Sequence, residues 1–343
     1  MFDRIMFTFI DLFAGIGGFR IGLEQLGGQC VFSSEIDKHA AATYERNFGE
    51  KPAGDITRIH PDEVPRHDVL CGGFPCQPFS VSGKQRGFED ARGTLFFEVM
   101  RLVTAKRPRA VFLENVANYA RHQNGDTLKR TVAMLESEGY RVSHAILNAS
   151  NFGVPQARRR LYIVGVRSDV ESQAFEFPES SNSDKKVAIK DILISNAEAC
   201  EQIIDRIDIR FDDTKTQSAT SRPLQIGTIN KGGQGERIYS IEGHGITLSA
   251  HGGGAAAKTG AYLVDGVVRR LHPIECRRMM GFPEWFSIDS RRGQAYKQFG
   301  NAVAVPVIEA IGKRMLESAD LAWKQAEWKF DDSSKARNLE TAS

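Results

Sequence analysis

The sequence lacks any long apolar run. None of its hydrophobic stretches approaches the roughly 18 residues that a membrane-spanning helix needs, and residues 1–4 have neither the basic region nor the cleavage site of a signal peptide. Cysteine is also scarce: there are five, and no two form a Cys-x-x-Cys pair. This pattern argues against a disulfide framework or a zinc site. We expect a metal-free protein of a reducing compartment, with a cytoplasmic location as the default.

A large excess of one charge is absent as well. The 45 lysines and arginines nearly balance the 43 acidic residues, which leaves a net charge of +2. Such a chain is no bulk polycation, although it can still concentrate positive charge on one face. Small basic clusters occur at 158–160, 269–270, 277–278 and 291–292. Taken singly, each is more typical of a solvated surface than of a binding site.

Apolar runs alternate with helical periodicity in the first half of the chain. Runs that favour strands lie at 7–13, 30–34, 68–71, 110–113, 142–147 and 161–166, and helical patterns lie at 19–26, 38–48, from 95 onward and at 127–138. Strands that alternate with helices predict an α/β fold. Its doubly wound, mostly parallel sheet is expected to be covered by helices on both faces. The helical pattern returns at 306–321.

The composition changes after Pro178. Residues 227–260 contain ten glycines, which is too many for long helices, so a smaller domain of short strands and loops is expected there. The predicted boundaries are 1–188 for the first domain, 189–272 for the small domain, 273–300 for a hinge, 301–329 for the return of the chain to the first domain, and 330–343 for a disordered tail.

A glycine-rich turn follows the first predicted strand. Gly15, Gly17 and Gly18 stand before a helix, and Glu35 ends the second strand. In a doubly wound sheet this edge binds ligands, and an acidic residue there typically accepts hydrogen bonds from ribose hydroxyls. Position 20 is arginine, where a nicotinamide fingerprint has its third glycine. A nucleoside without a pyrophosphate, such as S-adenosylmethionine, is therefore favoured over a dinucleotide. A plain tight turn is the alternative.

Cys76 is the candidate nucleophile. It lies between Pro75 and a Gln-Pro step, so it cannot lie within a helix and is expected on a loop at the cofactor edge. A thiolate there is a strong nucleophile near neutral pH. The alternative is a buried structural cysteine, which we favour for Cys71. Glu114 ends another strand, where it could transfer protons or simply cap a helix or pair with a cation.

Five short segments occur in an order typical of one enzyme family. They are residues 11–19 (DLFAGIGGF), 73–77 (GFPCQ), 114–116 (ENV), 156–160 (QARRR) and 298–301 (QFGN). Together they resemble the DNA (cytosine-5)-methyltransferase family, across nearly the whole chain up to about residue 311. Residues 231–240 resemble the recognition domain of the HhaI-type bacterial restriction-modification branch. The family therefore implies a methyltransferase fold with a small target recognition domain.

The resemblance implies a covalent mechanism. Cys76 would attack carbon 6 of cytosine, which makes carbon 5 reactive toward the methyl group of S-adenosylmethionine. Glu114 would bond ring nitrogen 3 and the exocyclic amine, Arg160 would hold the base carbonyl, and Arg158 would support this arrangement. These contacts are impossible inside a stacked duplex, so the base would have to be flipped out.

Further residues are assigned by the same resemblance. The implied cofactor-binding residues are Phe13, Gly15, Gly17, Gly18, Glu35, Ile36, Asp55, Ile56, Pro75, Leu95 and Asn301. Residues 79–88 would form a loop that closes over the base, and the implied DNA-binding residues are Ser80, Ser82, Lys84, Arg86, Gln234, Arg237 and Tyr239. Many relatives have an aromatic residue where this chain has Ile36.

The expected substrate is double-stranded DNA with a short target, of GCGC type by resemblance. The enzyme would be monomeric and nucleoid-associated in a prokaryote, and a cognate restriction endonuclease would act on the same site without having to bind. One alternative is a transfer-RNA cytosine-5 methyltransferase, because a branch of the family modifies RNA. The other is a non-catalytic DNA-binding protein, which should have lost Cys76, Glu114 or Arg160; all three are present.

Overall fold

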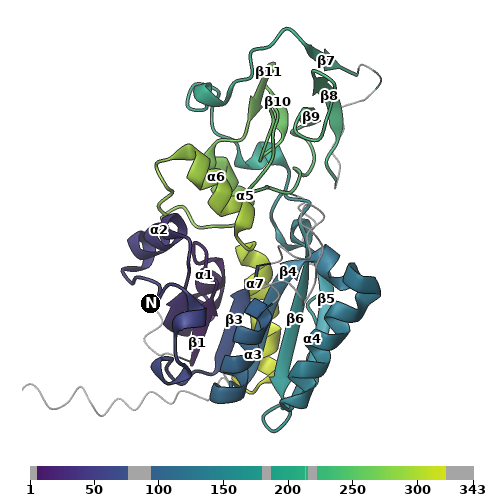
Figure 1. Cartoon of the computed structure of the whole chain (residues 1–343). Coiled ribbons are helices and arrows are strands. Elements are labelled where there is room, and N and C mark those ends of the chain that lie inside the picture. Colours follow the sequence, from purple (N-terminus) through teal and green to yellow (C-terminus); the bar gives the residue numbers. More distant parts are fainter. Residues whose placement is uncertain (1–5, 76–93, 180–186, 213, 215–221, 322–343) are drawn as a thin grey trace, which may run out of the picture.

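A computed structural model describes residues 6–75, 94–179, 187–212, 214 and 222–321. Within these residues six strands form one sheet in the order β2-β1-β3-β4-β6-β5 (Figure 1). The strands are β1 (Phe7–Leu12), β2 (Gly28–Ser34), β3 (Val69–Gly73), β4 (Ala110–Val116), β5 (Tyr140–Asn148) and β6 (Arg159–Arg167). Strands β1 to β4 pair in parallel, whereas β6 is antiparallel to both of its neighbours. The predicted mostly parallel α/β fold is confirmed, with β6 as the exception.

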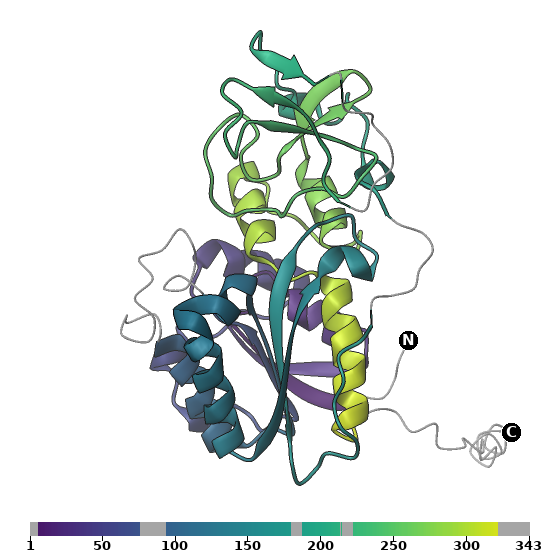
Figure 2. The same cartoon turned by 90° about the vertical axis from the view of Figure 1, so that its right-hand side faces the viewer.

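Helices cover both faces of this sheet because its strands are apolar on both sides. Along β4, Ala110 and Phe112 pack into one core cluster, and Val111 and Leu113 pack into the other. Figure 2 shows the helices of the two layers on opposite sides of the strands. The first cluster includes α1 (Gly18–Glu24) and α7 (Val305–Ser318), the second includes α3 (Thr94–Lys106) and α4 (Asp126–Ser137), and α2 (Lys38–Phe48) follows β2.

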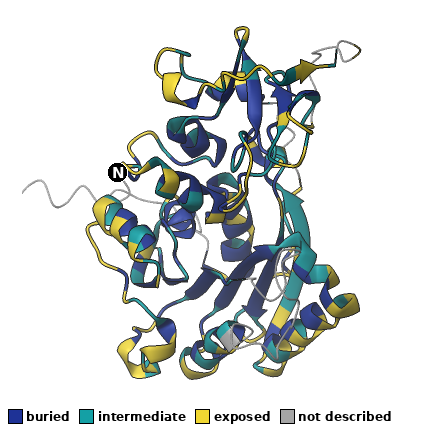
Figure 3. Ribbon diagram, turned by 45° about the horizontal axis from the view of Figure 1, so that its top comes forward, coloured by how far each residue is buried: buried dark blue, intermediate teal, exposed yellow. Residues whose placement is uncertain are grey.

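A second, smaller sheet lies above the first in Figure 1. Its five described strands have the order β11-β10-β9-β8-β7, and only the β9–β10 pair is parallel. They are β7 (Ile209–Phe211), β8 (Gln225–Ile229), β9 (Arg237–Ser240), β10 (Ala261–Val264) and β11 (Val267–Arg270). A separate small apolar core, which includes Ile226, Ile229, Ile238 and Val268, supports this sheet. Figure 3 shows buried segments in both sheets, with exposed residues mainly at the periphery.

Two helices that the periodicity did not predict lie between the sheets. They are α5 (Pro273–Met279) and α6 (Arg292–Asn301), in the segment expected to be a hinge (Figure 1). Helix α5 begins with a capping box: the His272 ring accepts a hydrogen bond from the backbone, and the Glu275 carboxylate accepts one from the His272 N–H. Among the described helices, none has the length and apolar character needed to cross a bilayer.

Candidate functional site

A cavity of about 370 Å³ opens where the carboxyl ends of β1 to β4 meet. This is the edge at which parallel α/β sheets bind ligands, because the connecting loops diverge there. One part of the cavity is lined by the loops after β1 and β2, and another by β4, the start of β6 and the end of α6. A ligand bound beside Glu35 would therefore share one space with a ligand bound beside Glu114.

The turn after β1 is tied to the end of β2. The Gly15 N–H donates to Oε2 of Glu35 at 2.8 Å, and the Asp37 N–H donates to Oε1 at 2.7 Å. Both carboxylate oxygens are thus oriented by the backbone, with lone pairs remaining for a further donor. Gly17 has a φ of 87°, and a Cβ there would lie 2.3 Å from the Phe48 ring. Only glycine fits this position without movement of the ring.

Glu114 and Arg160 form the polar centre of the second part of the cavity. Arg160 Nε lies 3.1 Å from Oε1 of Glu114, and their side chains are only 14% and 11% exposed. They come from adjoining strands: Glu114 pairs with Tyr162 in the antiparallel register, and Arg160 lies two positions away. Burial raises the pKa of the Glu114 carboxyl above its ordinary value, although Arg160 and Arg158 act in the opposite direction. A carboxyl with a raised pKa can hold a proton and donate it to a ligand.

Arg158 is buried beside this pair but is bound differently. Its guanidinium donates to the carbonyls of Leu248 at 3.2 Å, Gly300 at 3.1 Å and Ala302 at 2.7 Å. Burial lowers the pKa of Arg158, and the positive charge of Arg160 lowers it further, whereas Glu114 opposes the shift. The contacts make Arg158 a link between three chain segments around the cavity, while Arg160 faces the carboxylate.

The structure brings most of the predicted residues together. Cavity-lining residues include Glu114, Arg158 and Arg160, and also Phe13, Gly15, Glu35, Ile36, Asp55, Ile56, Pro75, Leu95 and Asn301. Gly17 and Gly18 lie outside the lining and pack against Phe48 and Val303 instead. Cys76, Ser80, Ser82, Lys84 and Arg86, as well as the predicted closing loop at 79–88, lie outside the described residues. Pro75, directly before Cys76 in the chain, lines the cavity.

Some lining residues were not predicted. Lys297 Nζ lies 2.6 Å from Oδ2 of Asp37, so this ion pair joins α6 to the loop after β2 at the cavity wall. Asn115 lies within the ENV motif and donates to the Phe74 carbonyl at 3.1 Å, which positions the loop that leads to Pro75. Lys297 directly precedes the QFGN motif. Its position beside this motif is the feature of the sequence that could have predicted its place at the cavity.

The predicted recognition residues differ in exposure. Gln234 and Arg237 are exposed on the second sheet and its loop. Tyr239 is only 7% exposed and packs against Tyr262, with ring centroids 6.0 Å apart, so its position in the core differs from the expected surface position. The Glu236 side chain braces the loop that carries Gln234 by accepting from Asn230 Nδ2 at 2.9 Å and the Gly233 N–H at 3.1 Å.

The described residues contain no group of three or more His, Cys, Asp and Glu side chains that could hold a metal ion. The cavity instead combines apolar walls with a backbone-oriented carboxylate and a buried Glu–Arg pair. Such a donor set suits a nucleoside and a planar heterocycle with both donors and acceptors.

Comparisons with known proteins agree with this geometry. Solved structures with the same fold include the Dnmt2 methyltransferase of S. pombe, with a TM-score of 0.71 and 17% identity, covering 91% of this chain and 98% of that one. This likeness shows the α/β methyltransferase fold. The model of the C-5 cytosine-specific DNA methylase family matches residues 7–317.

Curated relatives extend the match. The type II methyltransferase M.HhaI of Haemophilus parahaemolyticus is 49% identical over 303 residues, 88% of this chain and 92% of its own length. M.DsaV of Dactylococcopsis salina is 41% identical over 332 residues, 96% of this chain and 92% of its own. The chain belongs to the C-5 cytosine-specific DNA methylase family and is a DNA (cytosine-5-)-methyltransferase.

Proposed function

We propose that this enzyme transfers a methyl group from S-adenosylmethionine to carbon 5 of a flipped cytosine in a short duplex sequence, with Cys76 as the covalent nucleophile. One observation carries the proposal. The Glu114–Arg160 pair lies in the same cavity as the oriented Glu35 carboxylate and Pro75, the residue directly before Cys76. A base and a methyl donor can therefore share the cavity that Pro75, the residue before the cysteine, lines.

The residues around Glu35 fit the methyl donor. The carboxylate is held by two backbone N–H groups and is placed to accept from ribose hydroxyls. Ile36 is 71% exposed and lies at the cavity, where its apolar side chain would cover one face of the adenine. Asp55 and Ile56 line the same region and would flank the ring edge. When bound, the donor supplies an electrophilic sulfonium methyl group.

The protein's side chains would make cytosine reactive. The Cys76 thiolate forms a bond to carbon 6, and the ring electrons shift toward carbon 5, which would then take the methyl group. The carbon–sulfur bond of that methyl group breaks, and its electron pair stays on sulfur, which becomes a neutral thioether. Glu114, whose raised pKa favours its protonated form, donates to ring nitrogen 3, and its carbonyl oxygen accepts from the exocyclic amine. Arg160 donates to the base carbonyl. Loss of the carbon 5 proton to solvent, expulsion of the Cys76 thiolate and return of the nitrogen 3 proton to Glu114 then restore the aromatic ring.

The depth of this site supports base flipping. Glu114 and Arg160 are both largely buried, so they cannot reach the Watson–Crick edge of a stacked, paired base. The flipped cytosine would occupy the space beside this pair. Ser80, Ser82, Lys84 and Arg86 are proposed to contact DNA from the loop at 79–88.

Target recognition is proposed for the second sheet and its loops, within residues 189–272. Arg237 is exposed on β9 and can form a bidentate contact with guanine, and Gln234 can fill the space that the base vacates. The buried position of Tyr239 favours a supporting role over direct contact. The resemblance of residues 231–240 to the HhaI-type domain supports a GCGC target.

The relatives M.HhaI and M.DsaV are named type II methyltransferases. We accordingly propose that this enzyme protects host DNA in a restriction-modification system, acting as a monomer on a site shared with an endonuclease. Bisulfite sequencing of DNA from cells that express the protein tests the proposal. Methylated cytosines within one short sequence are expected. Methylation of purified transfer RNA without methylation of DNA would contradict it.

A further inference from the structure

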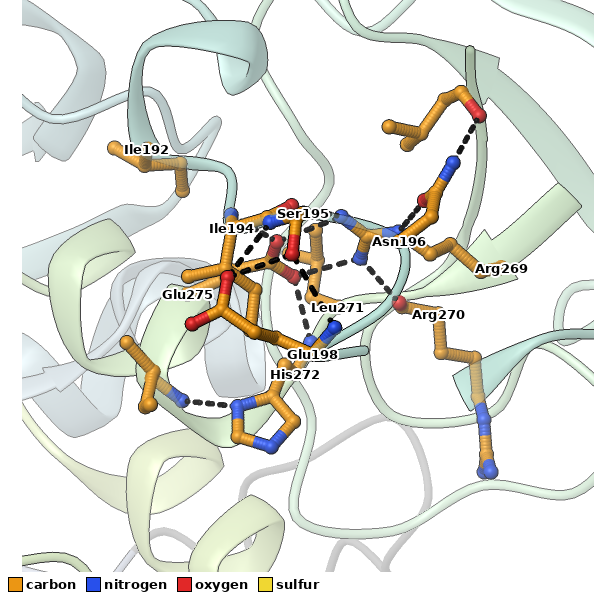
Figure 4. Close-up of polar contacts among 12 residues, drawn as sticks. Ile192, Ile194, Ser195, Asn196, Glu198, Arg269, Arg270, Leu271, His272 and Glu275 are labelled. Carbon is orange, nitrogen blue, oxygen red and sulfur yellow. Dashed lines mark hydrogen bonds and ion pairs between the residues drawn. The ribbon is translucent and has the colours of Figure 1, made fainter. Parts of the chain in front are cut away.

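A fully buried ion pair lies at the base of the second sheet. Arg269, in β11, and Glu275, in the first turn of α5, are both 0% exposed. Arg269 Nη2 donates to Oε1 at 2.8 Å and Nη1 donates to Oε2 at 2.9 Å, so the contact is bidentate. Figure 4 shows the two side chains facing one another among the surrounding polar contacts. Two parallel bonds fix the angle between the guanidinium and the carboxylate as well as their distance.

The pair is also bonded to the chain that enters the second sheet. Arg269 Nε donates to Oδ1 of Asn196 at 2.8 Å, and Nη2 donates to the Ile194 carbonyl at 3.1 Å (Figure 4). In return, Oε1 of Glu275 accepts from the Ile194 N–H at 2.9 Å, and Oε2 accepts from the His272 N–H at 2.7 Å. The pair thus joins the incoming segment, the last strand and the first turn of α5.

The sheet register connects this pair with the proposed DNA-contacting strand. Arg269 pairs with Tyr262 of β10, and Tyr262 pairs with Tyr239 of β9. The exposed Arg237 lies two residues before Tyr239 on the same strand. A row of paired backbone positions therefore runs from the buried ion pair to the strand that carries Arg237.

The other end of α5 is attached to the catalytic side. The Met280 carbonyl, at its C-terminus, accepts from the Val305 N–H at 3.0 Å. A second attachment runs through Arg158, which donates to Leu248 beyond β9 and to Gly300 at the cavity wall. With both attachments in place, rotation of the second sheet about the junction is opposed at two separated points.

We propose that Arg269 and Glu275 form a positioning pair that holds the second sheet in the orientation needed to present a DNA site to the cavity. This inference rests on the proposed recognition role of that sheet. Replacement of a buried ion pair by well-packed apolar groups of similar volume often leaves stability unchanged, so stability alone does not explain its presence. Its directional bonds give the junction a defined angle, which an apolar contact would not.

The test uses the doubly substituted protein Arg269→Met/Glu275→Gln. Both charges are removed together, and the glutamine keeps an acceptor oxygen for one of the backbone N–H groups. We expect a cooperative unfolding transition at a lower melting temperature, because the Asn196 and Ile194 oxygens lose their donor. The dissociation constant for S-adenosylmethionine should stay close to that of the wild type. The KM for duplex DNA should rise at least tenfold, and the kcat/KM ratio between the target and a singly mismatched site should fall at least tenfold, with kcat changed less than threefold.

Two further variants make the result decisive. Asn196→Ala removes one arm of the network, and about a threefold increase in the KM for DNA is expected even if the double variant does not fold. Val268→Ala is the matched control, because Val268 precedes Arg269 in β11 but packs into the apolar core of the second sheet. Val268→Ala lowers stability without removing a contact of the ion pair, so it should keep the wild-type kcat/KM ratio between the target and the mismatched site.

The positioning role would be overturned if the folded double variant kept the wild-type KM for DNA and the wild-type discrimination between sites. If the double variant does not fold, a wild-type KM for DNA in Asn196→Ala would overturn it. An equal loss of discrimination in Val268→Ala would also overturn it. Failure of the proposed function is distinguishable, because then the wild-type protein itself would not methylate DNA.

Discussion

Replacement of Glu114 by glutamine isolates the charge and proton that this residue brings to the cavity. The amide has nearly the same size, so the packing of β4 against β6 should be kept. The substitution removes the ion pair with Arg160, in which Oε1 of Glu114 lies 3.1 Å from Arg160 Nε in a largely buried position. The amide can still form hydrogen bonds with cytosine, but it has no carboxyl proton to transfer to nitrogen 3 as charge develops on the ring.

The magnitude follows from comparable sites. Removal of one donor aimed at developing charge costs about 2.7–4 kcal/mol of transition-state stabilisation, which corresponds to roughly 10²–10³ in kcat. We therefore expect Glu114→Gln to lower the single-turnover rate at saturating DNA by that factor. The dissociation constant for S-adenosylmethionine should change little, because Glu35 and Ile36 lie in the other part of the cavity.

The assay is transfer of a labelled methyl group to duplex DNA under single-turnover conditions. Glu98→Gln is the control, because it breaks an Arg–carboxylate pair of 2.6 Å with Arg101 in α3, outside the lining residues. It should keep a rate within about threefold of the wild type, as expected for an ion pair outside the reaction site. A Glu114→Gln rate as high as that of the control would refute the role given to Glu114.

Three other predictions follow from the described contacts. In Gly235→Ala, the new Cβ would lie 1.9 Å from the Gly253 carbonyl oxygen, so the two glycine-rich loops would have to move apart. The KM for DNA should then rise about tenfold or more, which corresponds to the loss of about 1.4 kcal/mol of binding free energy. Ile36→Trp adds an aromatic face at the cavity and should tighten S-adenosylmethionine binding about 2- to 10-fold in calorimetry. Burial raises the pKa of Asp11 from 3.8 to about 8, so between these two pH values the folded protein keeps a proton that the unfolded chain has released. The free energy of unfolding should therefore fall as the pH rises from 3.8 to about 8. Asp11→Asn should flatten this decline in urea unfolding series; an unchanged slope would contradict it.

Much of the first domain could be predicted because its determinants are local. The apolar run at 110–113 marks β4, whose carboxyl-terminal half carries Glu114 to the ligand-binding edge, although the strand itself continues to Val116. The partners of Arg158 could not be predicted, because Leu248 and Gly300 lie far away in the sequence and meet it only in the folded protein.

The second domain was harder to predict in detail. Its short strands have no strong periodicity, so the composition indicated strands and loops without showing that β9 is buried on both faces after Arg237. Tyr239 therefore appeared equivalent to Arg237, although it packs against Tyr262. Helix α5 was missed because its N-cap is His272, which is not among the usual capping residues, although Pro273 and Glu275 follow at typical positions.

The nucleophilic role of Cys76 is the central claim, and a trapped adduct tests it most directly. Duplex DNA with 5-fluorocytosine at the target has no carbon 5 proton to lose after methyl transfer. Incubation with S-adenosylmethionine should give a denaturation-resistant protein–DNA complex, and mass spectrometry should place the attachment at Cys76. Cys76→Ala should form no such complex, whereas Cys71→Ala should still form it. An adduct of unchanged yield in Cys76→Ala would contradict the account.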